Sequence, residues 1–481
     1  MNKKTFLFVF FIFLACDVSS EKILIHNVNV IDPLDGISKN INVEISNNKI
    51  SSVGKKTSFF YSKKIDGSGK YLIPWLWDSH VHLYFDQELA KDMPMLFLKF
   101  GITSIRDTGG DFNFLDSIKN LSQKYPKSYP RLKISGPLID GKFNVYNGER
   151  LPNLSVKTEN VKETENVVNK LIASGADFLK AYEMLSPEQF EIIMKIAKKK
   201  KINVTGHIPL SMDIETASNL GLNSLEHIKN LELWATKDKN ELLKVRRGMM
   251  KNTRNLSGLN LRGMIHNTQK NYAINNLDKD ETIKIYEALA KNNTWQIPTI
   301  SIYKVPIYKI FKDDYWIENL KYLPEKTREI WEERINFSNK NINPKQKDFS
   351  DWVQRTTKEM HDYGIEFMAG TDTPLGFLIP GFSLHIELEL LVESGMSELD
   401  ALKTATINPS RYFKMENYLG LIKEGYIADL ILLNTNPLEN IKNTLDISLV
   451  VKDGKVYEDP LKIDWLTKSN IKTHHHNEAC N

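Results

Sequence analysis

The middle of the chain alternates short apolar segments with amphipathic helical segments over residues 75–415, and this alternation restricts the fold more than any other feature. One helical segment is clearly marked, since Ser186 can cap it, Pro187 suits its first turn and Gln189 completes a capping box. The strand-like segments include Ile102–Arg106, Leu132–Ser135, Asp177–Lys180, Asn203–Gly206, Ser224–Glu226, Gln296–Thr299 and Glu366–Gly370. Repeated strand–helix units predict an α/β chain with a parallel sheet, and about eight of them suit a (β/α)8 barrel of the TIM type.

Residues 21–74 and 416–460 have a different sequence pattern, in which apolar and polar residues alternate. Ile41, Val43 and Ile45, for example, are separated by single polar residues, which is the period-two pattern of a half-buried strand. Because such strands occur at both ends of the chain, we expect one small β-sandwich domain that is built from both ends and encloses the barrel.

Length and composition agree with this plan and weigh against some functions. A chain of 481 residues is long enough for a barrel and an accessory domain. The net charge of +4 is small for this length and gives no case for a nucleic-acid partner, which needs a clustered basic face. The 2 cysteines, Cys16 and Cys480, cannot build a disulfide framework or a cysteine-rich zinc site.

The amino-terminal residues 1–20 have the pattern of a targeting segment. Two lysines precede the apolar run 6–15, which is too short to span a bilayer as a helix. The run ends at Cys16 and resembles a bacterial lipobox, although Phe13 stands where leucine is usual. We therefore expect an exported lipoprotein, anchored by a lipid on Cys16 at the periplasmic or cell-surface face of a membrane. A plain cleaved signal peptide is the alternative, and the tail 461–481 is predicted to be a flexible end.

Residues able to bind metals follow the predicted strands. His80 and His82 lie two residues apart on the first strand, so both imidazoles point to one face. The other candidates end or closely follow four different strands, at Lys180, His207, His227 and Asp372. The carboxyl ends of barrel strands form the face where barrel enzymes carry their active sites. We therefore predict that these side chains meet in one site.

Several of these segments resemble motifs of the amidohydrolase superfamily, in particular its imidazolonepropionase-like and Xaa-Pro dipeptidase-like branch. The matching segments are Ile73–His82, Gly101–Asp107, Gly206–Pro209, Leu225–His227, Gly370–Asp372, Gly425–Leu430 and Asn436–Leu438. The resemblance extends to about Tyr457 and departs at Trp75, where the family usually has glycine. It implies a hydrolase in which a carboxylated lysine bridges two metal ions.

The resemblance implies a role for each candidate. Lys180 would bridge the two metals as a carbamate formed with CO2, because a free amine with a pKa near 10.4 stays protonated. A metal-bridging hydroxide would attack the substrate, and Asp372 would be the acid–base catalyst. Zinc fits imidazole and carboxylate ligands first, and manganese, cobalt and iron are compatible with them. The first metal would be held by His80, His82 and Asp372, and the second by His207 and His227.

Substrate-binding residues are harder to predict. Tyr182 lies two residues after Lys180 on the same strand face, and the resemblance favours His385, at the start of a predicted helix. Arg106 ends a strand and could meet either a substrate carboxylate or an internal acid. Each of these three residues also has a purely structural interpretation.

Two long connections, residues 231–293 and 304–363, are rich in charge. They are either solvated surfaces or the rim of the active site. If the first forms the rim, its arginines favour a substrate that bears a carboxylate; these are Arg246, Arg247, Arg254 and Arg262.

The sequence thus predicts a metal-dependent enzyme that hydrolyses a C–N bond, in an amide or a cyclic amide, of a small molecule or short peptide. A Xaa-Pro-type dipeptidase or carboxypeptidase is the alternative among enzymes, and ester or lactone hydrolysis needs the same chemistry. The alternative from another class is a surface lipoprotein that keeps the barrel as a catalytically silent scaffold, because one fold hosts many functions.

Mass spectrometry of the native amino terminus tests the lipid anchor. We expect a terminus at Cys16 that carries a diacylglyceryl or triacyl modification, because the apolar run ends at this cysteine. An unmodified terminus at another residue would contradict the anchor and leave simple secretion.

Overall fold

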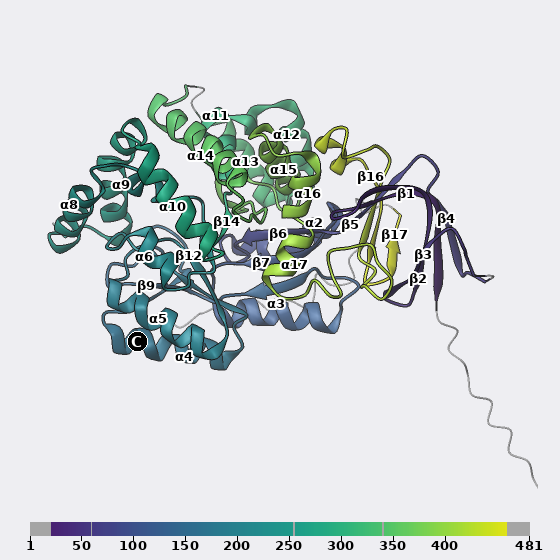
Figure 1. Ribbon diagram of the computed structural model, residues 1–481, viewed down its shortest axis with the longest axis horizontal. Coiled ribbons are helices and arrows are strands. Elements are labelled where there is room, and N and C mark those ends of the chain that lie inside the picture. Colours follow the sequence, from purple (N-terminus) through teal and green to yellow (C-terminus); the bar gives the residue numbers. More distant parts are fainter. Residues whose placement is uncertain (1–20, 59, 254, 339–340, 459–481) are drawn as a thin grey trace, which may run out of the picture.

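The computed structural model describes residues 21–58, 60–253, 255–338 and 341–458. The predicted signal segment with Cys16 and the predicted tail lie outside these ranges. Strands from both chain ends gather at one end of the molecule, and helices α8 (Lys239–Lys251) and α9 (Gly258–Asn275) lie at the opposite end (Figure 1). Within the described residues, no helix combines the length and the apolar character needed to cross a membrane.

The first sheet combines strands from both ends of the chain in the order β17-β16-β15-β5-β1-β2-β3, with β4 alongside β1. Ile25 and Val43 share one buried apolar cluster with Leu430 and Val451. A division into two stacked sheets, and the domain limits given above, stay predictions. The strands are β1 (Lys22–Asp32), β2 (Gly36–Ser46), β3 (Lys49–Gly54), β4 (Lys63–Asp66), β5 (Tyr71–Pro74), β15 (Leu430–Leu433), β16 (Ile447–Lys452) and β17 (Lys455–Tyr457).

The middle of the chain forms parallel strands in two ladders, β6-β7-β8 and β10-β9-β11-β12-β13-β14. Between the ladders, the amide of Asp177 donates a hydrogen bond to the Ile134 carbonyl (2.8 Å). The segment 366–373, which contains the last predicted strand, makes isolated parallel bridges to β14 and β6. This is an α/β fold of the TIM-barrel type, and full closure of the barrel stays a prediction. The strands are β6 (Leu76–Val81), β7 (Ile102–Asp107), β8 (Arg131–Ile134), β9 (Leu138–Asp140), β10 (Ser155–Lys157), β11 (Phe178–Ala181), β12 (Asn203–Gly206), β13 (Ser224–Glu226) and β14 (Trp295–Ile297).

Helices lie on both sides of the parallel strands, with α3, α4 and α5 on one side and α11 to α16 on the other (Figure 1). The capping box predicted for α5 is present, because the Ser186 hydroxyl accepts from the Gln189 amide (3.2 Å) and the Gln189 side chain accepts from the Ser186 amide (2.9 Å). The helices are α1 (Gln87–Ala90), α2 (Met93–Lys99), α3 (Phe112–Lys124), α4 (Val161–Ser174), α5 (Pro187–Lys200), α6 (Ile214–Asn219), α7 (Leu231–Trp234), α10 (Lys279–Lys291), α11 (Ile300–Tyr308), α12 (Asp314–Asn319), α13 (Glu325–Phe337), α14 (Pro344–Asp362), α15 (Phe382–Glu393), α16 (Glu398–Thr404) and α17 (Ile407–Tyr412), with 3-10 turns η1 (Ile310–Lys312), η2 (Leu320–Tyr322), η3 (Leu375–Phe377) and η4 (Ile441–Leu445).

Trp75, the departure from the family motif, fills the junction between β5 and β6. Its side chain is buried and packs on Trp77, with ring centroids 5.5 Å apart. Trp77 in turn stacks on Phe413 at 5.4 Å. The larger residue is therefore accommodated in an aromatic cluster and leaves the adjoining strand β6 intact.

Asp429 joins the terminal sheet to the parallel strands. Its buried carboxylate forms ion pairs with Arg131 on β8 and Lys452 on β16, and it accepts a hydrogen bond from Thr103 Oγ1 on β7 (2.8 Å). Burial raises the pKa of Asp429, but Arg131 and Lys452 outweigh burial and lower the pKa to about 2. The charged carboxylate is thus a link between parts that are far apart in sequence.

We expect Asp429→Ala to reduce the free energy of unfolding by about 3–5 kcal/mol, since it leaves the buried Lys452 ammonium without its ion-pair partner. Denaturant unfolding measures the loss. Asp362→Ala is the matched control, because Asp362 pairs with Lys358 on an exposed helix face and its loss should be negligible. Equal stability of the two variants would contradict the linking role of Asp429.

Candidate functional site

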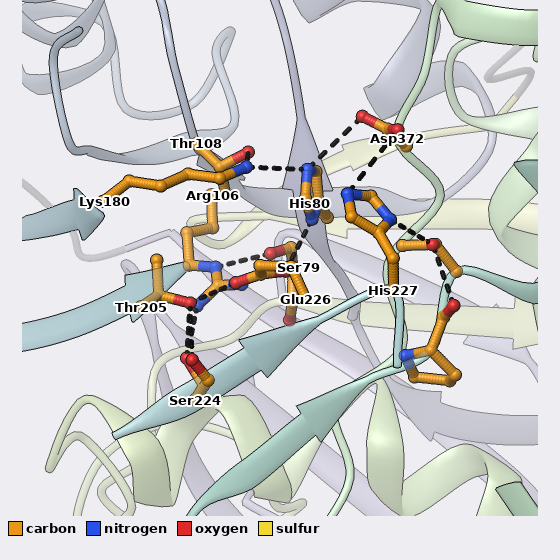
Figure 2. A network of polar contacts seen from close by, with 12 residues as sticks. Ser79, His80, Arg106, Thr108, Lys180, Thr205, Ser224, Glu226, His227 and Asp372 are labelled. Carbon is orange, nitrogen blue, oxygen red and sulfur yellow. Dashed lines mark hydrogen bonds and ion pairs between the residues drawn. The ribbon is translucent and has the colours of Figure 1, made fainter. Parts of the chain in front are cut away.

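Six predicted side chains meet at the carboxyl ends of the parallel strands, and Figure 2 shows His80, Lys180, His227 and Asp372 turned toward one another. Asp372 Oδ1 lies 3.3 Å from the Nε2 atoms of His80 and His82, and Asp372 Oδ2 lies 3.8 Å from Nε2 of His227. The sixth member is His207, whose ring centroid lies 4.9 Å from that of His227. All six side chains are buried.

Each imidazole is fixed through its Nδ1 atom. An acceptor at Nδ1 keeps the proton there, so the lone pair of Nε2 faces the centre of the site. Burial lowers the pKa of His207 to about 3 and holds that of His227 well below its usual value, so both rings are neutral near pH 7. Neutral imidazole is the form that binds metals. The Nδ1 contacts are His80 to Glu226 (2.6 Å), His82 to the Gly109 carbonyl (2.9 Å), His207 to Glu183 (2.5 Å) and His227 to Thr299 (2.6 Å).

The backbone turns sharply at two of the six clustered side chains. His227 has a φ of 65°, the following Ile228 has 54°, and Asp372 has 70°. Non-glycine residues rarely adopt this left-handed region, which costs about 1–3 kcal/mol and is frequent at functional sites. Asp78 holds the second turn in place, since its carboxylate accepts from the amide (3.0 Å) and hydroxyl (2.7 Å) of Thr371. This contact explains the aspartate in the first motif.

Lys180 extends from β11 toward the same centre (Figure 2). Its Nζ lies 3.3 Å from Nε2 of His80 and donates to Thr108 Oγ1 (3.1 Å). Burial lowers the pKa of Lys180 to about 8. A larger fraction of the amine is therefore neutral near pH 7 than in an exposed lysine.

Arg106 lies beneath the site, and the prediction that it contacts substrate is wrong. It is fully buried and donates to the Ser79 carbonyl (2.5 Å) and to Glu226 Oε1 (2.6 Å), as Figure 2 shows. Burial raises the pKa of Glu226, but Arg106 and His80 outweigh burial and hold that pKa well below its usual value. The internal acid that Arg106 serves is thus Glu226, which sequence reasoning missed although it directly precedes His227.

Glu183 is a second carboxylate that sequence reasoning missed. It is buried, lies three residues after Lys180, and contacts Nδ1 of His207 (2.5 Å). Arg262 and His266 of α9 also contact it. Burial raises the pKa of Glu183, but Arg262 and His266 outweigh burial and hold the pKa well below its usual value. Nothing in the local sequence around Glu183 indicates partners some 80 residues away.

The two remaining candidates for substrate binding, Tyr182 and His385, lie in different places. The buried Tyr182 packs with its ring centroid 4.5 Å from that of His207, so it lies beside the site and its contact with substrate stays a prediction. His385 is elsewhere, and its predicted role is wrong. Its ring nitrogens contact Thr444 Oγ1 (2.9 Å) and the Phe100 carbonyl (2.9 Å), just before the amino end of β7.

The geometry suits divalent cations. Among the described residues, Nε2 of His207 and Oδ1 of Asp372 are buried without a hydrogen-bond partner. The ligand atoms of His80, His227 and Asp372 lie within 4.8 Å of one another. Neutral imidazole nitrogens and a carboxylate are ligands that zinc and related metals take. These residues therefore fit the predicted metals, whose identity and number stay predictions.

The long connection 231–293 contributes to the rim of the site. Arg262 and Arg246 are largely buried rather than solvated, whereas Arg247 is on the surface and Arg254 is outside the described residues. A cavity of about 270 Å³ lies under α9, lined among others by Lys229, Glu232, Arg262, His266, Lys270 and Tyr303.

A larger hollow of about 840 Å³ lies elsewhere, against residues of α3, α4 and the segment 142–157. None of the six clustered side chains lines this hollow. The smaller cavity lies next to the six clustered side chains, because its wall includes Lys229, two residues after His227, and Tyr303, whose hydroxyl donates to the His227 carbonyl (3.1 Å).

Comparison with known proteins gives local matches among curated sequences. Ochratoxinase of Aspergillus niger is 38% identical over 102 residues, which cover 20% of this chain and 20% of that protein. Dihydroorotase of Syntrophotalea carbinolica is 44% identical over 62 residues, which cover 13% of this chain and 15% of that protein. This chain therefore matches about a fifth or less of the length of these relatives.

Solved structures match over much more of the chain. A Xaa-Pro dipeptidase with bound methionine in its active site has a TM-score of 0.66 at 20% identity, covering 91% of this chain and 100% of that chain. Ochratoxinase of A. niger has a TM-score of 0.64 at 19% identity, covering 92% and 96%. These likenesses show the fold. The model of the amidohydrolase family matches residues 71–457, from β5 to the end of β17. The chain therefore belongs to the amidohydrolase family and is an enzyme, as its sequence motifs predicted.

Proposed function

We propose that the protein hydrolyses a C–N bond, in an amide or a cyclic amide, of a small molecule or short peptide with the help of two divalent cations, zinc first. The main support is the set of four buried imidazoles that are fixed through Nδ1, three of which (His80, His82 and His227) place Nε2 within 3.8 Å of the Asp372 carboxylate. The relatives named ochratoxinase and dihydroorotase, and a solved structure named bottromycin amidohydrolase, agree with this chemistry.

The clustered residues would have different roles in metal binding and proton transfer. His80, His82 and Asp372 would hold one cation, and His207 and His227 the other. When bound, divalent cations supply Lewis acidity toward a substrate carbonyl and toward water. Asp372 would take the proton that the attacking water releases and deliver it to the leaving nitrogen.

Lys180 would serve as a carbamate. As an ammonium, its Nζ would carry a positive charge 3.3 Å from Nε2 of His80 and would repel cations there. The lowered pKa supplies neutral amine, whose lone pair forms a C–N bond to CO2 while one proton is released. The resulting anionic oxygens suit a bridging role between two cations.

The cavity under α9 favours a second candidate, a dipeptidase or carboxypeptidase. Lys229 lines it and makes no hydrogen bond or ion pair with the residues that the structure describes. Arg262 and Lys270 add positive charge to the wall, and Glu232 lies among them. A free substrate carboxylate is the complement of such a wall. The structural likeness to a Xaa-Pro dipeptidase agrees with this candidate.

A catalytically silent scaffold is less compatible with the site. A site that only binds ligands has no need to keep several imidazoles, a lysine and a carboxylate buried together, because such groups destabilise a protein unless they are compensated. Two charged residues, Arg106 and Glu226, are also buried beneath these ligands. As an exported protein anchored through Cys16, the enzyme would meet its substrates outside the cytoplasm.

Metal analysis followed by a substrate screen tests the proposed function. We expect two equivalents of divalent metal per chain, loss of nearly all activity on chelation, and recovery with Zn²⁺, because the imidazoles are useless for this chemistry without cations. The screen covers dipeptides, N-acyl amino acids and cyclic amides. For the dipeptidase, amidation of the substrate carboxylate should lower kcat/KM about tenfold or more, which corresponds to losing about 1.4 kcal/mol.

The outcomes separate the candidates. Hydrolysis of cyclic amides without regard to a free carboxylate supports the first candidate alone. A protein that binds no divalent metal and hydrolyses nothing in the screen contradicts both candidates and favours the silent scaffold.

Substitution of Lys180 tests the carbamate. We expect Lys180→Ala to lose most activity while the circular-dichroism spectrum stays unchanged, because the sheet and the apolar core are untouched. A short carboxylic acid with excess metal should restore part of the rate, since it can occupy the vacated bridge. Lys180→Arg is the matched control and should not be rescued, because it places a permanent cation in the site.

A Lys180→Ala variant with full activity and two bound metals would show that the bridge is not needed. A one-metal site on His80, His82 and Asp372 would then be the better interpretation.

A further inference from the structure

Glu183 connects a predicted metal ligand to a helix that is remote in sequence. Its Oε1 contacts Nδ1 of His207 at 2.5 Å. Arg262 donates to both oxygens, from Nη2 to Oε1 (3.0 Å) and from Nε to Oε2 (3.0 Å). His266 Nε2 contacts Oε2 at 2.7 Å. One buried carboxylate is therefore shared between the end of β11, the end of β12 and α9.

The spacing of α9 explains why it can reach this carboxylate. Arg262, His266 and Lys270 are each four residues apart, so they share one face of the helix. The guanidinium of Arg262 also lies over the ring of Tyr182, with its Cζ 5.9 Å from the centroid. Since Tyr182 packs on His207, α9 holds this imidazole both at its Nδ1 edge, through Glu183, and through the neighbouring ring.

The same helix covers the cavity next to the site. Gly263, Arg262 and His266 line that cavity of about 270 Å³. The amino end of α9 is pressed against the segment after β9, since a Cβ atom on Gly258 would lie 2.0 Å from the Phe143 carbonyl oxygen. Helices α8 and α9 together, called the cap below, form the end of the molecule opposite the terminal sheet (Figure 1).

We propose that Glu183 couples docking of the cap to binding of the second divalent cation at His207 and His227, with Arg262 as a positioning residue. This inference rests on the proposed two-cation function. A buried carboxylate keeps its orientation only if its donors are in place, and Arg262 supplies a bidentate contact. With the cap docked, Glu183 holds the Nδ1 proton of His207 and aims its Nε2, which has no partner among the described residues, at the site.

The coupling must work in both directions. If a docked cap raises the affinity for the second cation by some factor, that cation must stabilise the docked cap by the same factor. Binding of the cation would thus stabilise α9 over the cavity that it covers. In a protein that lacks this cation, the docked position of the cap would be less stable.

Zn²⁺ titration against a competing chelator tests the proposal on the full chain. We expect Arg262→Met to weaken binding of the second equivalent about 10–100-fold, as loss of a group that orients a ligand does, and to change the first equivalent less than about twofold. Methionine keeps an unbranched apolar side chain at this position but removes the charge and both hydrogen bonds to Glu183. The matched control is Arg247→Met, because Arg247 also joins the cap to the barrel, through the Ser211 carbonyl (2.9 Å), but does not contact Glu183.

Hydrogen exchange of residues 258–275 supplies the reciprocal measurement. In the wild-type protein and in Arg247→Met, the second equivalent of Zn²⁺ should slow exchange in α9. In Arg262→Met this protection should be lost or strongly reduced. If Arg262→Met fails to fold, His266→Phe removes a single contact to Glu183 and should show the same pattern to a smaller degree.

Equal weakening of both equivalents, or identical behaviour of Arg262→Met and Arg247→Met, would overturn the coupling while leaving the two-cation function standing. A wild-type protein that never binds a second equivalent would overturn the proposed two-cation site and the coupling with it.

Discussion

Four imidazoles are buried together in the site, and holding each of them in one orientation is the constraint on which the rest of the site depends. Each ring is held at Nδ1 by a different partner. Two partners are carboxylates, one is a hydroxyl and one is a backbone carbonyl. The two carboxylates then need compensation of their own, because burying an unpaired charge is costly. The need to compensate buried charge therefore extends from the imidazoles to residues that do not face the site.

The same solution recurs at three places in the molecule. A buried carboxylate is paired with an arginine and with further donors beneath the site (Glu226), at the junction with the terminal sheet (Asp429) and under the cap (Glu183). Each cluster joins elements that are distant along the chain, and separating those elements would leave a buried charge without its partner, which is costly.

The sequence predicted what depends on local spacing and missed what depends on distant partners. His80 and His82 could be predicted because a strand places residues two apart on one face, and the α5 capping box because it lies within four residues. Glu183 could not, since its partners on α9 lie about 80 residues away and no local pattern marks them. His385 was misplaced because the start of a helix after the last ligand gives no information on which end of the barrel it faces. The sequence predicts a strand over Glu366–Gly370, yet the segment 366–373 makes only single bridges to its neighbours.

Glu226 and His227 are consecutive residues, but the Glu226 carboxylate accepts a hydrogen bond from Arg106 beneath the site, whereas His227 faces into the site. Ser224 and Thr205 also lie beneath the site, where Thr205 contacts Glu226 and the two hydroxyls contact each other. A mutant library restricted to the pocket lining would omit these positions. Yet Thr205 contacts Glu226, the acceptor that His80 uses, and Ser224 contacts Thr205, so a screen for altered activity should include these buried positions.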